Sequence, residues 1–378
     1  MPMRTPLAWL NTIQNKKRTA TAVGGICFAV LLIFMQAGFL GAARLNSSLT
    51  YRQLDFNLMI VSRGYLMLTR SESIDIYRVI QARSVPGVAS VEGLLLEGGR
   101  WSNQVSNSSE SCFIFGLRPG GHYFLDPALN DSIGLLNERQ TVLVDRLARS
   151  SYGPWHTGGP AIVNRQELSI RGDYALGMGL LADGSVITSL DTYLRLYGIP
   201  QLREYQFGLV RTAPGADVNA VATALREALP RDVLVLTKPD LIEREENYFV
   251  NVKPVGVMFQ VGMFVAFLVG AVILYQILSS EIANRLREFA TLKAMGYTER
   301  YIYAVGIRQG LIFSLMGYFP SLILSFGLYR LLRALSSFPV YMDLTRALFV
   351  LGLTLAMCAI AAVFALGKIK RADPADLF

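Results

Sequence analysis

The sequence predicts an α-helical membrane protein with four transmembrane helices plus a large α+β extracytoplasmic (periplasmic) domain between the first and second helices. Of its 378 residues, 52% are hydrophobic and 17% are charged, and its mean hydropathy is positive, which is atypical of soluble globular proteins. Four runs of about 20 residues contain no Asp, Glu, Lys or Arg, and each is long enough to cross a bilayer as a helix. These runs are Val23–Ala43, Val255–Leu278, Gly310–Leu328 and Ala347–Leu366.

The charge distribution gives the orientation of these spans. The net charge is +8, yet residues 44–253 hold 21 basic and 22 acidic residues, which leaves 15 basic and 6 acidic residues for the rest of the chain. Most of this basic excess lies beside the ends of spans, as the positive-inside rule expects of cytoplasmic flanks. It therefore indicates a membrane protein with both termini in the cytoplasm, and no nucleic-acid partner is expected. Arg330, Arg333 and Arg346 go against the rule, because they fall on the outer side.

The N-terminal residues precede the first span as an amphipathic segment. Thr5-Pro6 is typical of a helix start, and Trp9 with Lys16, Lys17 and Arg18 describes a helix at the inner membrane interface. We expect this elbow to anchor the chain at the cytoplasmic face.

The region between the first two spans alternates strand-like and helix-like runs. Strand composition and length occur at Phe56–Val61, Val88–Leu96, Cys112–Gly116, Thr141–Val144, Glu167–Ile170, Ser185–Ser189, Gln206–Val210 and Val233–Leu236. Helix-like runs cover Ile74–Arg83, Leu190–Tyr197 and Val218–Leu229, and Leu241–Lys253 is a polar helix-like run that leads to the second span. The order predicts an α+β domain of one or two subdomains, with helical connections to the membrane.

A charged amphipathic segment, residues 279–302, separates the second and third spans. Ile282, Leu286, Phe289 and Ala290 recur on one helical face, and Glu281 precedes Arg285 by the four residues that favour an ion pair. Gly296 suits a tight turn between two helices. The sequence thus predicts a short cytoplasmic helix, placed to receive force from a partner.

In full, we expect an elbow helix at 1–20, spans at 21–43, 254–278, 303–332 and 346–367, the large domain with its helical connections at 44–253, the coupling region at 279–302, a short outer loop at 333–345 and a tail at 368–378.

The sequence contains no motif that indicates an enzyme. It contains no G-x-x-x-x-G-K-[ST] loop for a nucleotide phosphate, and Gly177-Met-Gly179-Leu-Leu-Ala182 lacks the strand and helix that a dinucleotide site needs. His122 and His156, the two histidines, have no neighbouring ligand at metal-site spacing. We therefore expect no catalytic residues, no metal and no cofactor bound by this chain.

The sequence resembles a known family of transport proteins. The topology, the segment REFATLKAMG at Arg287–Gly296 and the ending RADPADLF resemble the FtsX-like, MacB-type permeases of ABC transporters. Within these, TPLAWLNTIQNKKRTATAVGGICFAVLLIFMQAGF, FIFGLRPGGHYF and TVLVDRLARSSYGP look most like the DevC-type permease subunit of heterocyst glycolipid exporters. The resemblance implies a permease of the bacterial inner membrane that works without catalysing a reaction itself.

The resemblance also implies partners. In such permeases the segment between the second and third spans is a coupling helix that docks on a separate nucleotide-binding subunit, which binds ATP and Mg. The implied contacts here are Glu281, Arg285, Arg287, Glu288, Thr291, Leu292, Lys293 and Gly296. A second permease copy, a periplasmic membrane-fusion adaptor and a TolC-like outer-membrane channel would complete a tripartite exporter of a lipid, glycolipid or other hydrophobic substrate, driven by mechanotransmission. Two alternatives are a lipoprotein-releasing permease and an FtsX-like scaffold that activates a cell-wall hydrolase.

Overall fold

The computed structural model describes residues 16–179, 181–284, 299–336 and 339–367. It divides into two compact units. The membrane unit comprises Met1–Ala42 and Pro254–Phe378, and the large domain comprises Ala43–Lys253. One helix, α2 (Lys16–Gln53), contributes residues to both units.

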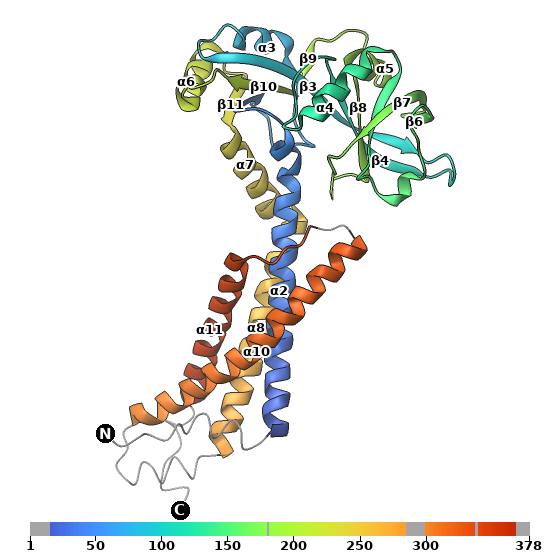
Figure 1. The fold of residues 1–378 in the computed structure, drawn as a ribbon. Coiled ribbons are helices and arrows are strands. Elements are labelled where there is room, and N and C mark those ends of the chain that lie inside the picture. Colours follow the sequence, from blue (N-terminus) through green and yellow to red (C-terminus); the bar gives the residue numbers. More distant parts are fainter. Residues whose placement is uncertain (1–15, 180, 285–298, 337–338, 368–378) are drawn as a thin grey trace, which may run out of the picture. The chain divides into compact units, whose positions relative to one another are not determined.

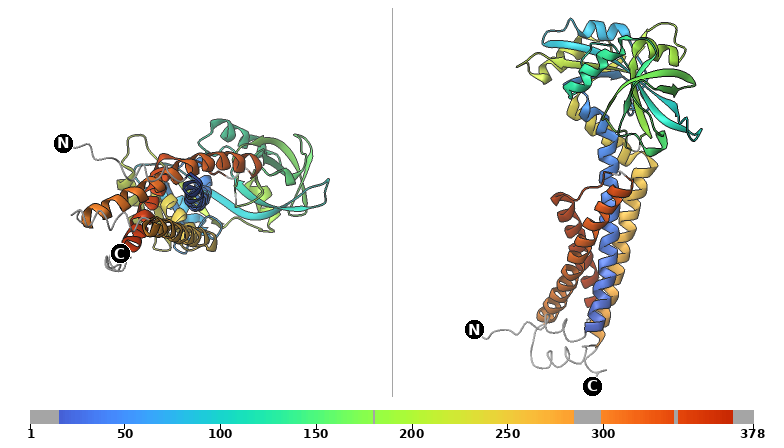
Figure 2. Two further views of the ribbon diagram at one scale, coloured as in Figure 1. Left: turned by 90° about the horizontal axis from the view of Figure 1, so that it is seen from below. Right: turned by 45° about the vertical axis from the view of Figure 1, so that its right-hand side comes forward.

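Four described helices are long and apolar enough to cross a membrane: α2, α8 (Pro254–Asn284), α10 (Glu299–Ser336) and α11 (Leu344–Gly367). In the membrane unit they run side by side (Figures 1 and 2). One helix precedes the large domain and three follow it, so the predicted fold class is confirmed.

The membrane unit has its own apolar core, to which every one of these helices contributes. Ile26 of α2, Leu274 of α8, Phe313 of α10 and Met357 of α11 are all buried in one cluster. Polar side chains inside it bond to backbone carbonyls of neighbouring helices, as the Ser321 hydroxyl does to Cys27 O at 2.9 Å. Such bonds satisfy hydroxyl groups that have no water partner inside a bilayer.

The large domain is built on a nine-stranded sheet in the order β11-β1-β10-β3-β4-β8-β5-β7-β6, within its described residues. A two-stranded pair, β2 (Ile74–Asp75) with β9 (Glu204–Tyr205), stands apart from it. The nine strands are β1 (Leu58–Ser62), β3 (Val88–Ser102), β4 (Ser109–Leu117), β5 (Thr141–Asp145), β6 (Pro160–Val163), β7 (Gln166–Tyr174), β8 (Gly184–Ser189), β10 (Phe207–Thr212) and β11 (Val233–Thr237).

The first half of the sheet has the split βαβ arrangement. Strands β1, β3, β10 and β11 carry two crossover helices, α3 (Ile76–Ala82) and α6 (Val218–Ala228), and lie in the order β11-β1-β10-β3. Alternate residues of β1 face opposite sides: Leu58 and Ile60 join the core with α3 and α6, whereas Met59 and Val61 join the second core. Both faces are therefore covered, which explains why all five residues of β1 are buried.

The second half is inserted between β3 and β10 and closes on itself. Strand β3 pairs with β10 through Val88–Leu94 and with β4 through Leu95–Ser102. Its last residues also pair with β6, Trp101 opposite Val163, so that β3, β4, β8, β5, β7 and β6 form a closed ring. The predicted alternatives of one or two subdomains thus resolve into two halves that share one long strand (Figure 1).

All eight strand-like runs of the sequence are strands, and the four helix-like runs are helices, with shifted ends. The last of these is α7 (Lys238–Asn251), which begins three residues before the predicted Leu241. Strands β2, β6 and β9 and helix α4 (Pro127–Ile133) were not predicted from the sequence. These elements are short, and Pro160 obscures the start of β6 because proline is unusual inside a strand. Asp126-Pro127 is a helix-start signal that the prediction overlooked.

Candidate functional site at the helix junction

Most of the predicted coupling contacts lie outside the described residues: Arg285, Arg287, Glu288, Thr291, Leu292, Lys293 and Gly296. Glu281, near the end of α8, is described, and its Oε2 accepts a hydrogen bond from Gln309 Nε2 of α10 at 3.3 Å. Of the predicted elbow, Trp9 also lies outside, and Lys16, Lys17 and Arg18 form the start of α2 without described side chains. The coupling and elbow assignments therefore stay predictions.

The described residues instead reveal a densely bonded site in the large domain. We call it the helix junction; it comprises residues 43–53 of α2, helix α7 and the segments 54–57, 62–70 and 175–179. It positions the last three turns of α2 against α7 and against both halves of the sheet.

Residues on one face of α2 bond to a single carboxylate on α7. Ser48 Oγ and Arg52 Nη2 donate to Glu246 Oε1 at 2.9 and 3.0 Å, and Arg44 Nε lies 3.9 Å from Glu246 Oε2. Arg44, Ser48 and Arg52 are spaced by four residues and so share a helix face. The two arginines are about half exposed, so their ion pairs fix orientation and contribute little stability.

A buried chain of hydrogen bonds lies beside this exposed one. Glu245 of α7 is fully buried; its carboxylate accepts a hydrogen bond from the Tyr65 hydroxyl and bonds from Leu68 N at 2.9 and 3.1 Å. The Tyr65 hydroxyl lies 2.8 Å from that of Tyr51 on α2. One carboxylate thus joins α7, segment 62–70 and, through Tyr65, α2.

Burial controls the ionisation of this chain. Removal from water raises the pKa of Glu245 to about 7, although the bonds from Tyr65 and Leu68 oppose the rise. Burial and the nearby Glu245 charge raise the pKa of Tyr65 well above its ordinary value. Tyr65 therefore remains a donor, while the carboxylate changes charge near neutral pH.

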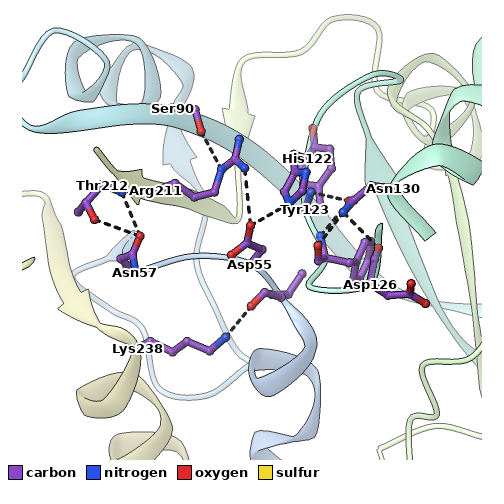
Figure 3. A network of polar contacts seen from close by, with 12 residues as sticks. Asp55, Asn57, Ser90, His122, Tyr123, Asp126, Asn130, Arg211, Thr212 and Lys238 are labelled. Carbon is purple, nitrogen blue, oxygen red and sulfur yellow. Dashed lines mark hydrogen bonds and ion pairs between the residues drawn. The ribbon is translucent and has the colours of Figure 1, made fainter. Parts of the chain in front are cut away.

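The segment that connects α2 to β1 is held on three sides (Figure 3). Asp55 Oδ2 lies 2.8 Å from His122 Nε2 and 3.6 Å from Arg211 Nη1 of β10. Lys238 Nζ, at the start of α7, donates to Leu54 O at 2.6 Å. These contacts tie the end of α2 to the sheet, to α7 and to the loop before α4.

Asn57 completes this attachment at the edge of β1. Its Oδ1 accepts hydrogen bonds from Thr212 N at 3.0 Å and from Thr212 Oγ1 at 3.2 Å (Figure 3). Asn57 N also donates to Val210 O at 2.9 Å. The connection from α2 thus enters the sheet without a free hinge.

The loop that carries the glycine motif packs on α2. Gln53 Nε2 donates to Leu176 O at 2.6 Å, and a Cβ at Gly179, whose φ is +56°, would overlap the amide of Asn46. Asp145, buried at the end of β5, accepts hydrogen bonds from Leu176 N at 3.2 Å and from Gly177 N at 2.7 Å. Residues 175–179, which carry both glycines of the motif, form a loop that attaches the closed half of the sheet to α2.

The key residues of the junction were not predicted from the sequence, although the sequence contains a signal for them. Leu241 and Glu245 are one helical turn apart and both are buried on α7, so a carboxylate sits on the apolar face of an amphipathic helix. A charged residue on such a face needs dedicated partners. Within the described ranges, no group of three His, Cys, Asp or Glu side chains suits a metal ion.

Comparison with known proteins gives one match to a family model. Residues 261–374, which include most of α8, α10 and α11, match the FtsX-like permease C-terminal family model. Comparison with curated proteins gives no significant match.

Two solved structures resemble part of the chain. The periplasmic region of MacB from Actinobacillus actinomycetemcomitans is 16% identical, with a TM-score of 0.37, and the match covers 52% of this chain and 95% of that chain. The extracellular domain of the noncanonic ABC-type transporter YknZ from Gram-positive bacteria is 11% identical, with a TM-score of 0.34, and the match covers 48% of this chain and 99% of that chain.

Proposed function

We propose that this chain is an FtsX-like permease of an ABC transporter, which couples ATP hydrolysis by a separate nucleotide-binding subunit to a movement of the large domain outside the membrane. Both termini lie in the cytoplasm in this proposal, and residues 279–302 dock on the ATPase. The permease acts with a second copy of itself, a periplasmic membrane-fusion adaptor and a TolC-like channel to export a lipid, glycolipid or other hydrophobic substrate, as a DevC-type permease would. ATP and Mg bind to the partner subunit, and the permease catalyses no reaction itself.

The observation that carries this proposal is the continuity of α2. The helix runs without interruption for 38 residues, from Lys16 in the membrane unit to Gln53 in the large domain. Residues 43–53 span about 16 Å at the rise of an α-helix, and their polar side chains bond to α7 and to the loop at Leu176. A helix transmits displacement along its axis because its own hydrogen bonds resist stretching, so α2 suits mechanotransmission.

The second connection between the units has a different construction. Helix α7 ends at Asn251 and α8 begins at Pro254, with the short segment Val252-Lys253 between them. Proline is favoured in the first turn of a helix and does not extend the preceding one. The two connections therefore differ in the chain: α2 is continuous, whereas α7 and α8 are separated at residues 252–253. In this proposal α2 transmits the movement and α7 follows it.

The proposal is tested by purification of the full-length permease in a gentle detergent, followed by identification of its partners and an assay of ATP hydrolysis. We expect an ABC ATPase and a membrane-fusion adaptor to co-purify, and we expect Glu288→Lys to abolish permease-dependent hydrolysis without loss of membrane insertion. A matched control is Glu227→Lys, which changes an exposed carboxylate on α6.

The partners that co-purify also distinguish the alternatives. A peptidoglycan hydrolase without an adaptor would favour the FtsX-like scaffold, and a soluble lipoprotein carrier would favour the lipoprotein-releasing permease. Co-purification of no ATPase at all would contradict the proposal and both alternatives.

A further inference from the structure

Three arginines gather at one end of the membrane unit. Arg330 and Arg333 lie in the last two turns of α10, and Arg346 lies in the first turn of α11. Arg346 packs on Gly41 of α2, where an added methyl group would overlap its guanidinium. This is the end at which α2 continues into the large domain, opposite to the end that holds the cationic start of α2.

Aromatic side chains hold the three guanidinium groups in place. Arg330 lies over the Phe326 ring at 5.1 Å and Arg333 lies over the Tyr341 ring at 4.8 Å. Arg346 donates a hydrogen bond to Tyr341 O and lies 5.9 Å from the centre of the Tyr329 ring. Arg333 and Arg346 therefore approach the same residue, and cation–π contact orders them without neutralising their charge.

The described part of this end has too few acids to neutralise the arginines. Asp343 is its acidic side chain, and it lies 3.9 Å from Arg346 Nη2. Neither Arg330 nor Arg333 has an ion pair among the described residues, and the Nε of Arg333 is buried without a hydrogen-bond acceptor there. Arg330 is exposed and Arg333 is partly buried, and both guanidinium groups are therefore placed to bind an anion from outside the chain.

The surroundings of the arginines identify the class of anion. Leu331, Leu335 and Leu344 are adjacent to them in the chain and are 56%, 76% and 75% exposed. An anionic headgroup above apolar chains matches a cationic rim above exposed leucines, whereas a free inorganic anion gains nothing from the leucines.

We propose that Arg330, Arg333 and Arg346 form a binding site for the phosphate headgroup of an anionic phospholipid, in the leaflet at the end of the membrane where the chain enters the large domain. The proposal accounts for three arginines on the side where the positive-inside rule does not place them. It rests on the membrane unit alone and holds whatever the permease exports.

The test measures lipid binding to the intact permease in detergent by native mass spectrometry. Phosphatidylglycerol, phosphatidylcholine and inorganic phosphate serve as separate probes, and the variants are Arg330→Gln/Arg333→Gln and, as a milder change, Arg330→Gln alone. The control is Arg308→Gln, an exposed arginine in the N-terminal half of the same helix. The melting temperature of each variant reports whether it is folded.

We expect the phosphatidylglycerol affinity of the double variant to fall at least about fivefold. The affinity of the single variant should fall about twofold. The control should bind like the unmodified permease. Phosphatidylcholine should bind more weakly than phosphatidylglycerol, and millimolar inorganic phosphate should not displace the lipid. Equal binding of the two lipids, unchanged binding by both arginine variants, or displacement by inorganic phosphate would each overturn the proposal.

Discussion

Glu245 on α7 accepts a hydrogen bond from the hydroxyl of Tyr65, inside the large domain and out of contact with water. Because the Tyr65 hydroxyl also meets that of Tyr51 on α2, this pair connects the two helices through which the large domain adjoins the membrane unit in the chain. Above its pKa of about 7 the Glu245 carboxylate is charged, and a hydrogen bond to a charged acceptor is stronger than a neutral one. The helix junction is therefore a stiff element that depends on one ionisable group.

This dependence predicts a pH effect on stability. The pKa of Glu245 is about 7 in the folded protein, against a value of 4.5 for an exposed glutamate. Between pH 4.5 and pH 7 Glu245 is protonated in the folded protein but ionised in the unfolded chain. Its contribution to the free energy of unfolding is therefore complete below about pH 4.5 and is lost as the pH rises through 7. We expect this group to lower stability by about 3 kcal/mol between pH 4.5 and pH 8.

Thermal unfolding of the full-length protein at several pH values checks this prediction. Glu245→Gln should flatten the decline between pH 5 and pH 8, whereas the exposed Glu227→Gln should leave it unchanged. Parallel declines in the unmodified protein and in Glu245→Gln would show that another group is responsible.

Removal of the Tyr65 hydroxyl should weaken the junction directly. Tyr65→Phe keeps the ring but takes one donor from a buried carboxylate, and we expect a loss of about 1.5–3 kcal/mol in the free energy of unfolding. The lost bond normally lowers the pKa of Glu245, so the pH transition should also move upward. The control, Tyr77→Phe, changes a tyrosine that is 64% exposed. An effect no larger than that of the control would mean that the hydroxyl contact is dispensable.

The attachment of α2 to the glycine loop predicts a different substitution effect. Gly179→Ala adds a methyl group that overlaps Asn46 and also stands at a φ of +56°. Gly120→Ala is the matched control, because Gly120 has a φ of +79° and open space around its Cβ position. The control should lose about 1 kcal/mol from backbone strain alone, and Gly179→Ala should lose at least about 1 kcal/mol more from overlap. The free energy of unfolding of each variant is measured by chemical unfolding. Equal losses for Gly179→Ala and Gly120→Ala would show that the contact between Gly179 and Asn46 does not contribute to stability.

Packing inside the membrane unit can be tested on one helix. A Cβ at Gly317 of α10 would overlap Ile26 of α2, whereas a Cβ at Gly327 of the same helix meets nothing within 4 Å. Gly317→Val should therefore lower the melting temperature in detergent, by about 1–3 kcal/mol in free energy, and Gly327→Val should have little effect. If the two valine variants melt alike, α2 and α10 do not pack at this point.

The membrane fold could be predicted from the sequence because its determinants are local. An uncharged run such as 255–278 is sufficient evidence for a membrane helix, and strands such as β5 were recognisable from β-branched residues bounded by turns. The sharing of β3 between two halves was not predictable. Strand β3 pairs with β10 up to Leu94 and with β4 from Leu95 onward, and no local sequence feature marks this change of partner. Strand partners are chosen by tertiary packing.

The candidate site was less accessible to sequence reasoning. Glu245 was read as part of a polar run, since its partners Tyr65 and Leu68 lie about 180 residues away in the chain. Glu288 and Lys293 were chosen by resemblance, and they lie outside the described residues. The arginines at 330 and 333 stood out only as exceptions to a charge rule, and their aromatic partners became visible in the folded membrane unit.

The rigidity of α2 is the central claim, and one measurement tests it most directly. Insertion of Gly-Gly-Ser after Ala43 breaks the helix between the units, and the same insertion after Asn107, in the exposed β3–β4 turn, is the control. Substrate export and ATP hydrolysis are measured together for the protein assembled with the ATPase subunit that the proposed function requires. The account predicts that the α2 insertion abolishes export while hydrolysis continues, and that the control keeps both. Normal export by the α2 insertion variant would contradict transmission through this helix.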